Sequence, residues 1–155
     1  MRPMNFDFDA PYDDADPWGF ILFARNVESP EQLARLTADL RESVGRDAPV
    51  LVDQEGGRVQ RLRSPHWREW LPMLEEVAAL PPDRRERGLW LRSRLIAAEL
   101  RAVGIDVNCA PVLDLACAGT HPVILNRCIS GDPSETARLG RAVADGLLAG
   151  GVLPV

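Results

Sequence analysis

The segment "LVDQEGGRVQRLR" (residues 51–63) joins a short apolar run to a dense group of polar side chains. Within it, residues 53–61 contain two carboxylates, a pair of glycines and two guanidiniums: Asp53, Glu55, Gly56, Gly57, Arg58 and Arg61. A short apolar run without alternation is typical of a strand in a parallel sheet, because such strands are buried on both faces. The segment therefore predicts a buried strand whose carboxyl end presents several groups able to bind a ligand or react.

Strand-like and helix-like segments alternate on both sides of this stretch. The predicted strands are "GFILF" (19–23), "PVLVD" (49–53), "IDVNCAPVLD" (105–114) and "VLPV" (152–155). The predicted helices are 29–44, about 83–103, and 132–151. This regular alternation predicts right-handed βαβ units, a parallel sheet and therefore an α/β fold.

The ends of the predicted helices carry sequence signals. Ser29 and Asp132 are expected N-caps, because each precedes a proline at the first helical position. Gln32 and Glu135 stand where a capping box has its glutamine or glutamate. The expected C-terminal stops are glycines: Gly45, Gly104, Gly150 and Gly151.

Two architectures fit the alternation: an open doubly wound sheet, or part of a (β/α)₈ barrel. In both, ligands bind at the carboxyl ends of the strands. Polar residues follow three of the predicted strands at that end: Arg25 and Asn26, then 53–57, then Asp114. The topology therefore predicts a functional rim at these residues in either architecture.

The composition excludes several classes of protein. The chain has 155 residues, which predicts one domain, and a net charge of −5 without a basic stripe, so we expect no nucleic-acid partner. No apolar run approaches the roughly 18 residues of a membrane span, and the acidic N-terminus does not resemble a secretory signal. Three cysteines without C-x-x-C spacing predict free thiols. We therefore expect a cytoplasmic protein without a metal or a cofactor.

The polar segment allows more than one chemistry. Asp53 and Glu55 are candidates for the paired carboxylates of glycoside hydrolysis; alternatively, Asp53 binds a ligand or caps backbone while Glu55 pairs with an arginine. Gly56 and Gly57 lack the context of a phosphate-binding loop, so positive φ or close backbone packing is the simpler explanation. The two arginines either bind ligand oxygens through two hydrogen bonds or form ordinary salt bridges.

The histidines and tryptophans are weaker candidates. His66 and His121 have no partner at metal-ligand spacing, which favours a role in a loop. Trp67 and Trp70 could stack on a sugar, although packing beneath the long connection that follows the second strand is the commoner outcome. No G-x-S-x-G motif is present, so a hydrolytic serine is not indicated.

The order of five segments resembles glycoside hydrolase family 3. The segments are "GFILFARN" (19–26), "LVDQEGGRVQRLR" (51–63), "APVLD" (110–114), "VILNRCISGDP" (123–133) and "AGGVLPV" (149–155). The chain is most similar to the bacterial β-N-acetylhexosaminidases that remove N-acetylglucosamine from cell-wall muropeptides in the cytoplasm. The resemblance covers about residues 17–155. It implies an irregular acidic lead-in at 1–17 and, at 18–155, an incomplete N-terminal domain with roughly half of a (β/α)₈ TIM barrel.

The resemblance also implies roles for individual residues. Asp53 and Arg61 match positions that hold the hydroxyls of the N-acetylglucosamine ring, and Arg127 matches a third sugar-binding arginine, although three of its neighbours differ from the family's usual residues. No residue matches a catalytic group. The family's Lys-His pair, its acid/base histidine and its nucleophilic aspartate would all follow Val155.

The expected function is therefore that of a truncated β-N-acetylhexosaminidase, whose parent reaction is retaining hydrolysis of terminal β-linked N-acetylglucosamine. The chain by itself is expected to be inactive, and the open edges of a partial barrel are expected to favour self-association. Two alternatives stay open. One is a fragment that binds the sugar, or docks on a partner, without catalysis; the other is an unrelated open α/β binding domain.

Overall fold

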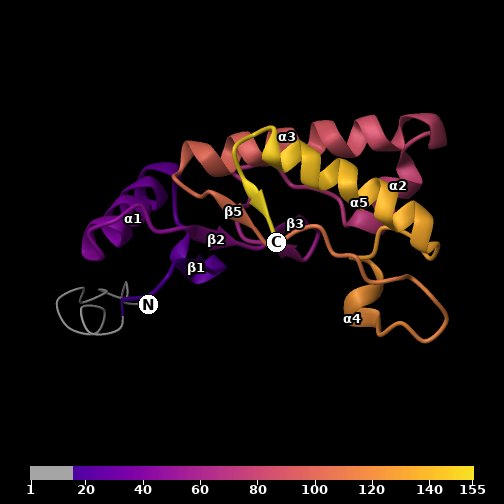
Figure 1. Ribbon diagram of the computed structural model, residues 1–155, viewed down its shortest axis with the longest axis horizontal. Helices are drawn as coiled ribbons and strands as arrows, with labels where there is room; N and C mark the ends of the chain where they lie inside the picture. The colour runs from indigo at the N-terminus through magenta and orange to yellow at the C-terminus, as the bar shows by residue number, and fades with distance from the viewer. Residues whose placement is uncertain (1–15) are drawn as a thin grey trace.

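The computed structural model describes residues 16–155, so the predicted lead-in at 1–17 lies outside the described residues except at its last two positions (Figure 1). The strands are β1 (Phe20–Leu22), β2 (Val50–Val52), β3 (Gln54–Gly56), β4 (Val59–Gln60), β5 (Val107–Asn108) and β6 (Leu153–Pro154). The α-helices are α1 (Pro30–Ser43), α2 (Met73–Ala79), α3 (Arg85–Ala102), α4 (Pro122–Leu125) and α5 (Pro133–Leu148). Short 3₁₀ turns are η1 (Ala24–Asn26) and η2 (Pro82–Arg84).

Four of the strands form a parallel sheet in the order β1-β2-β5-β6. One row of the register joins Ile21, Leu51, Val107 and Leu153 across the sheet. The strands keep their order along the chain, as they do in a (β/α)₈ barrel, whereas a doubly wound sheet reverses its order at a switch point. The predicted α/β fold is confirmed, and the sheet is part of a barrel.

The helices begin where the sequence predicts. The Oγ of Ser29 accepts a hydrogen bond from Gln32 N at 3.2 Å, and Asp132 Oδ1 accepts one from Glu135 N at 2.7 Å. The Gln32 side chain accepts from Glu28 N instead of closing the box on the N-cap itself. Helices α3 and α5 lie side by side along the sheet (Figure 1). Within residues 16–155, no helix combines the length and apolar character of a membrane span.

The core lies between the helices and one face of the sheet. It joins strand residues to helix residues: Leu22, Val50 and Val52 to Leu33, Leu89, Leu100 and Leu139. On the opposite face, Ile21 is 46% exposed and Leu153 is 50% exposed. The prediction that the 19–23 strand is buried on both faces is therefore wrong at Ile21, whereas Val107, in the same row on the inner strand β5, is only 3% exposed.

One strand is shorter than predicted, and two strands were not predicted. Strand β5 is limited to Val107–Asn108, although 105–114 was predicted to be extended throughout. Cys109 N still donates to Val52 O at 2.9 Å, but Ala110 N turns back to Asn108 O, and Pro111 has no N–H to continue the ladder. The long connection after β2 contains the β3–β4 hairpin and α2, and its Trp70 is buried in the core.

Candidate functional site

A two-stranded antiparallel hairpin follows β2 directly and forms the base of the site. Strands β3 and β4 pair Gln54 with Gln60 and Gly56 with Val59. Gly56 has φ +112° and Gly57 has φ +58°, so both occupy backbone conformations that favour glycine. A Cβ on Gly56 would lie 2.5 Å from Leu71 O, which no real side chain could tolerate. The two glycines are therefore explained by the turn and by close packing.

Buried amides fix this hairpin to the main sheet. Gln54 N donates to Asn108 Oδ1 at 2.9 Å, and Asn108 Nδ2 donates back to Gln54 O at 3.1 Å. The Gln54 Oε1 accepts from the backbone N–H groups of Arg61 and Leu62, each at 3.0 Å. Because Gln54 and Asn108 are both 1% exposed, this network holds the backbone of Arg61 in a defined place beside the end of β2.

Asp53 and Arg61 form an ion pair at the rim. Arg61 Nη2 donates to Asp53 Oδ2 at 2.6 Å, and the side chains are 24% and 21% exposed, respectively. The guanidinium also lies over the Phe23 ring, with Cζ 5.9 Å from the ring centroid. The predicted pair is therefore brought together, half-buried and in contact with solvent, with an aromatic face beside it.

Glu55 forms the second ion pair of the rim, with Arg127. Arg127 donates from Nε to Glu55 Oε2 at 2.9 Å and from Nη2 to Glu55 Oε1 at 2.7 Å. This pairing raises the pKa of Arg127, and the charges of Asp114 and Asp53 act in the same direction. All three predicted sugar-binding residues therefore belong to one electrostatic group at the carboxyl ends of β2 and β5.

The alternative in which Glu55 pairs with an arginine is confirmed, with Arg127 as the partner. The neighbouring Arg58 is not that partner. Instead Arg58 donates to the backbone oxygen of Val123, and Glu55 takes its two hydrogen bonds from Arg127. Arg58 therefore fastens the α4 segment to the hairpin, while the Glu55 carboxylate orients a rim arginine.

Two further residues, Phe23 and Cys109, lie at the rim and were not predicted from the sequence. Phe23, Asp53 and Cys109 are the first residues after β1, β2 and β5, so the rule that identified Asp53 could have found all three. Burial raises the pKa of the Cys109 thiol, and the charge of Asp53 and a hydrogen bond to it raise that pKa further. Cys109 therefore lies against the Asp53 carboxylate as a neutral thiol.

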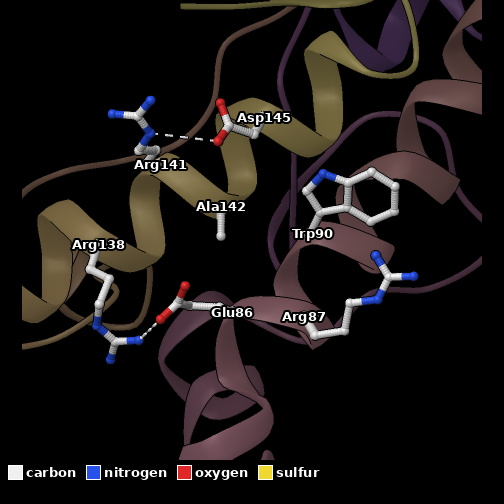
Figure 2. A pocket seen from close by; sticks show the side chains of 7 residues that line it. All are labelled: Glu86, Arg87, Trp90, Arg138, Arg141, Ala142 and Asp145. Atoms are coloured by element: carbon white, nitrogen blue, oxygen red, sulfur yellow. Dashed lines mark hydrogen bonds and ion pairs between the residues drawn. The ribbon is translucent and has the colours of Figure 1, made fainter.

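The rest of the described surface offers no second set of this kind. Within residues 16–155, no group of three or more His, Cys, Asp and Glu side chains could hold a metal ion. A cavity of about 450 Å³ lies between α3 and α5, away from the rim (Figure 2). Its arginines are engaged locally: Arg138 with Glu86, Arg141 with Asp145, and Arg87 over the Trp90 ring.

The described histidines are loop residues. His121 Nδ1 accepts a hydrogen bond from Val123 N at 3.1 Å and caps α4, as the sequence favoured. His66 packs edge-on against Trp67, with 5.6 Å between the ring centroids.

Comparison with known proteins identifies the family. The family model described as "Glycosyl hydrolase family 3 N terminal domain" matches residues 17–155. A beta-hexosaminidase of Nitrosomonas eutropha is 40% identical over 140 residues, which cover 88% of this chain and 39% of the relative. The chain thus spans well under half the length of such relatives.

Solved structures agree with this match. The crystal structure of NagZ from Neisseria gonorrhoeae in complex with N-trifluoroacetyl-D-glucosamine is 36% identical, with a TM-score of 0.78 over 88% of this chain and 41% of that one. A family 3 β-N-acetylglucosaminidase from Paenibacillus is 30% identical, with a TM-score of 0.80 over 92% of this chain and 27% of that one. The chain therefore belongs to glycoside hydrolase family 3 and matches the N-terminal domain of that family.

Proposed function

We propose that Asp53, Arg61 and Arg127 hold the hydroxyls of a terminal β-linked N-acetylglucosamine residue, as the substrate-binding part of a family 3 β-N-acetylhexosaminidase. One observation carries the proposal: two carboxylate–guanidinium pairs stand together at the strand ends where barrel enzymes bind their substrates. The similarity to a NagZ solved with an N-acylglucosamine analogue supports the choice of sugar.

The chemistry of the two pairs suits sugar recognition. A carboxylate accepts hydrogen bonds and a guanidinium donates them, so each pair can bind vicinal hydroxyls in a directional manner. The ion pair also holds the Asp53 and Arg61 side chains in one orientation, in a partly buried setting, before any sugar arrives. The Phe23 ring, which lies beside Arg61, adds an apolar surface to this wall.

The same geometry argues against a catalytic role for the segment. Retaining hydrolysis needs one carboxylate free to attack the anomeric carbon and a second group that transfers protons. Asp53 and Glu55 are each held in a close ion pair with an arginine, so neither carboxylate is free to attack the anomeric carbon. We therefore assign the segment to recognition, within a parent reaction of retaining hydrolysis.

A turnover assay tests this assignment. Residues 1–155 should not hydrolyse a chromogenic N-acetyl-β-glucosaminide, because the chain supplies substrate-binding groups without a matching nucleophile or acid/base group. Hydrolysis that stays with the protein through purification and disappears in Asp53→Ala would contradict the proposal, because residues 1–155 would then suffice for catalysis.

A second candidate function is docking through the open face of the sheet. Strands β1 and β6 are the outermost strands of the described sheet, and Ile21 and Leu153 on them are about half exposed. Exposed apolar surface favours association, either with another copy of this chain or with a polypeptide that completes the barrel. Sedimentation velocity over a range of protein concentrations measures the self-association that this predicts.

Membership of the family does not by itself specify the natural substrate or the cellular compartment. A sugar-binding site of this kind suits N-acetylglucosamine-containing muropeptides, and hence peptidoglycan recycling in the cytoplasm. The three free cysteines of the described residues support this setting. Fractionation of the producing cell, with detection of the chain in the cytoplasmic fraction, tests it.

A further inference from the structure

We infer that Arg92, a buried arginine on α3, is a positioning residue for the sugar-binding rim. It holds the Glu55 strand of the hairpin where the Glu55 carboxylate meets the Arg127 guanidinium. The inference deepens the proposed function and rests on it for one consequence only, which is the effect of Arg92 on sugar binding by Arg127.

Arg92 is an unusual residue for a helix that packs against a core. It is 3% exposed, and burying a guanidinium is unfavourable unless several partners compensate for the lost water. Burial lowers the pKa of Arg92, while the charge of Glu76 acts in the opposite direction. Glu76 supplies the ion pair, with its Oε2 3.1 Å from Arg92 Nη1.

A single nitrogen of Arg92 ties two segments of the site together. Nη2 donates to the backbone oxygen of Glu55 at 2.7 Å and to that of Leu71 at 2.7 Å. The same nitrogen lies so close to Gly56 that a Cβ there would come within 2.2 Å of it. Arg92 therefore packs directly against the backbone of β3 and fixes its distance from α3.

The link to the rim runs through one residue. Arg92 holds the main chain of Glu55, and the Glu55 side chain accepts both hydrogen bonds from Arg127. Trp70 supports the arrangement, because its ring lies 5.6 Å from the Arg92 Cζ and its backbone oxygen accepts from Gly57 N at 2.8 Å. A shift of Arg92 must therefore change where Arg127 meets the Glu55 carboxylate.

Lysine and arginine differ at this position in a way that can be tested. A guanidinium can reach two carbonyl oxygens and a carboxylate in fixed directions, whereas an ammonium on a flexible stem keeps the charge but not that geometry. Arg85 is a matched control, because it lies on the same helix, donates to Val77 O at 3.1 Å and pairs with Glu135 at 2.8 Å. It does not contact the hairpin through these bonds.

The experiment follows the Nε–H signal of Arg127 by NMR, assigned by its loss in Arg127→Lys. In the wild-type chain we expect slow exchange of this proton with water, because it is bound to Glu55. Arg92→Lys should raise the exchange rate roughly fivefold or more, and Arg85→Lys should leave it within about twofold. An unchanged exchange rate of the Arg127 Nε–H proton in a folded Arg92→Lys chain overturns the inference, whether or not sugar binding changes.

Titration with N-acetylglucosamine separates this inference from the proposed function. Weaker binding in Arg92→Lys than in Arg85→Lys is the expected consequence of a misplaced Arg127. If the wild-type chain does not bind the sugar while the exchange rates differ as expected, the proposed function fails and the positioning role stands. If Arg92→Lys does not fold, Glu76→Gln, which removes the charge paired with Arg92, takes its place. A rise in the exchange rate of the Arg127 Nε–H proton, smaller than the roughly fivefold rise expected for Arg92→Lys, then supports the inference. An unchanged exchange rate overturns it.

Discussion

The carboxylate of Glu55 and the guanidinium of Arg127 meet through two hydrogen bonds, at 2.9 and 2.7 Å, although 72 residues separate them in the chain. This contact joins the hairpin after β2 to the segment that follows α4. It also places Arg127 in the electrostatic group that contains Asp53. The rim is therefore formed by tertiary contacts between segments that are distant in the sequence.

Loss of the Glu55 charge should destabilise the fold and loosen Arg127. Glu55 is 8% exposed, so Glu55→Gln leaves a partly buried guanidinium without its counter-charge. We expect the free energy of unfolding to fall by about 1–3 kcal/mol. Glu86→Gln is the control, because its pair with Arg138 is exposed and should contribute at most about 1 kcal/mol. Equal losses in urea unfolding of the two variants would contradict the structure.

Crowding around Gly56 should make it less replaceable than another glycine of similar conformation. Gly56 and Gly119 have φ +112° and +97°, but only Gly56 has neighbours within reach of a Cβ. Both alanine variants pay for the positive φ, and Gly56→Ala should lose about 1–3 kcal/mol more because the side chain has no space. Chemical denaturation measures the difference. A Gly119→Ala chain that is as unstable as Gly56→Ala would show that the space around Gly56 is unimportant.

The thiol of Cys109 should report on the charge of Asp53. Its pKa is raised above the ordinary value of 9.0, by burial first and by Asp53 second. A raised pKa means less thiolate near neutral pH, so alkylation of Cys109 should be slower than that of the exposed Cys117 and should increase as the pH rises. Asp53→Asn should lower the Cys109 pKa and speed its alkylation relative to Cys117. Mass spectrometry of iodoacetamide-treated chains measures the alkylation of each cysteine. An unchanged ratio of Cys109 to Cys117 alkylation in Asp53→Asn would contradict the prediction.

A charge on the open face of the sheet should reduce self-association. Ile21 is 46% exposed on the uncovered face of β1, and Leu95 is 48% exposed on helix α3. Ile21→Lys should raise the dissociation constant for self-association about tenfold or more, because burying an unpaired charge in an interface is unfavourable. Leu95→Lys should change it little. Sedimentation velocity gives both constants, and a larger effect of Leu95→Lys would move the interface to the helices.

Much of the fold could be predicted because its signals are local. The N-caps Ser29 and Asp132 act within three residues of themselves, and the apolar strands are recognisable without their partners. The β3–β4 hairpin was missed because its stability comes from Gln54 and Asn108, which are 54 residues apart. The third strand was predicted too long because its apolar pattern continues beyond the point where Pro111 ends the pairing.

The contacts of the site also differ in how far the sequence could predict them. Asp53 and Arg61 are eight residues apart in one segment, so their pairing was within reach of sequence reasoning. The partners of Glu55 could not be deduced, because Arg127 and Arg92 compete with several nearer arginines and only the folded chain selects among them. The one signal that could have drawn attention to that contact is the helical spacing of Arg92 with Leu89 and Ile96, which places it on the buried face of α3.

The most direct test of the recognition assigned to this rim is an NMR titration of ¹⁵N-labelled chain with N-acetylglucosamine. We expect weak, saturable shifts for the amides of 53–61 and the Nε–H of Arg127, abolished in Asp53→Ala and retained in the surface variant Asp145→Asn. Absence of any saturable shift in the wild-type chain, or equal shifts in Asp53→Ala, would contradict the assigned recognition.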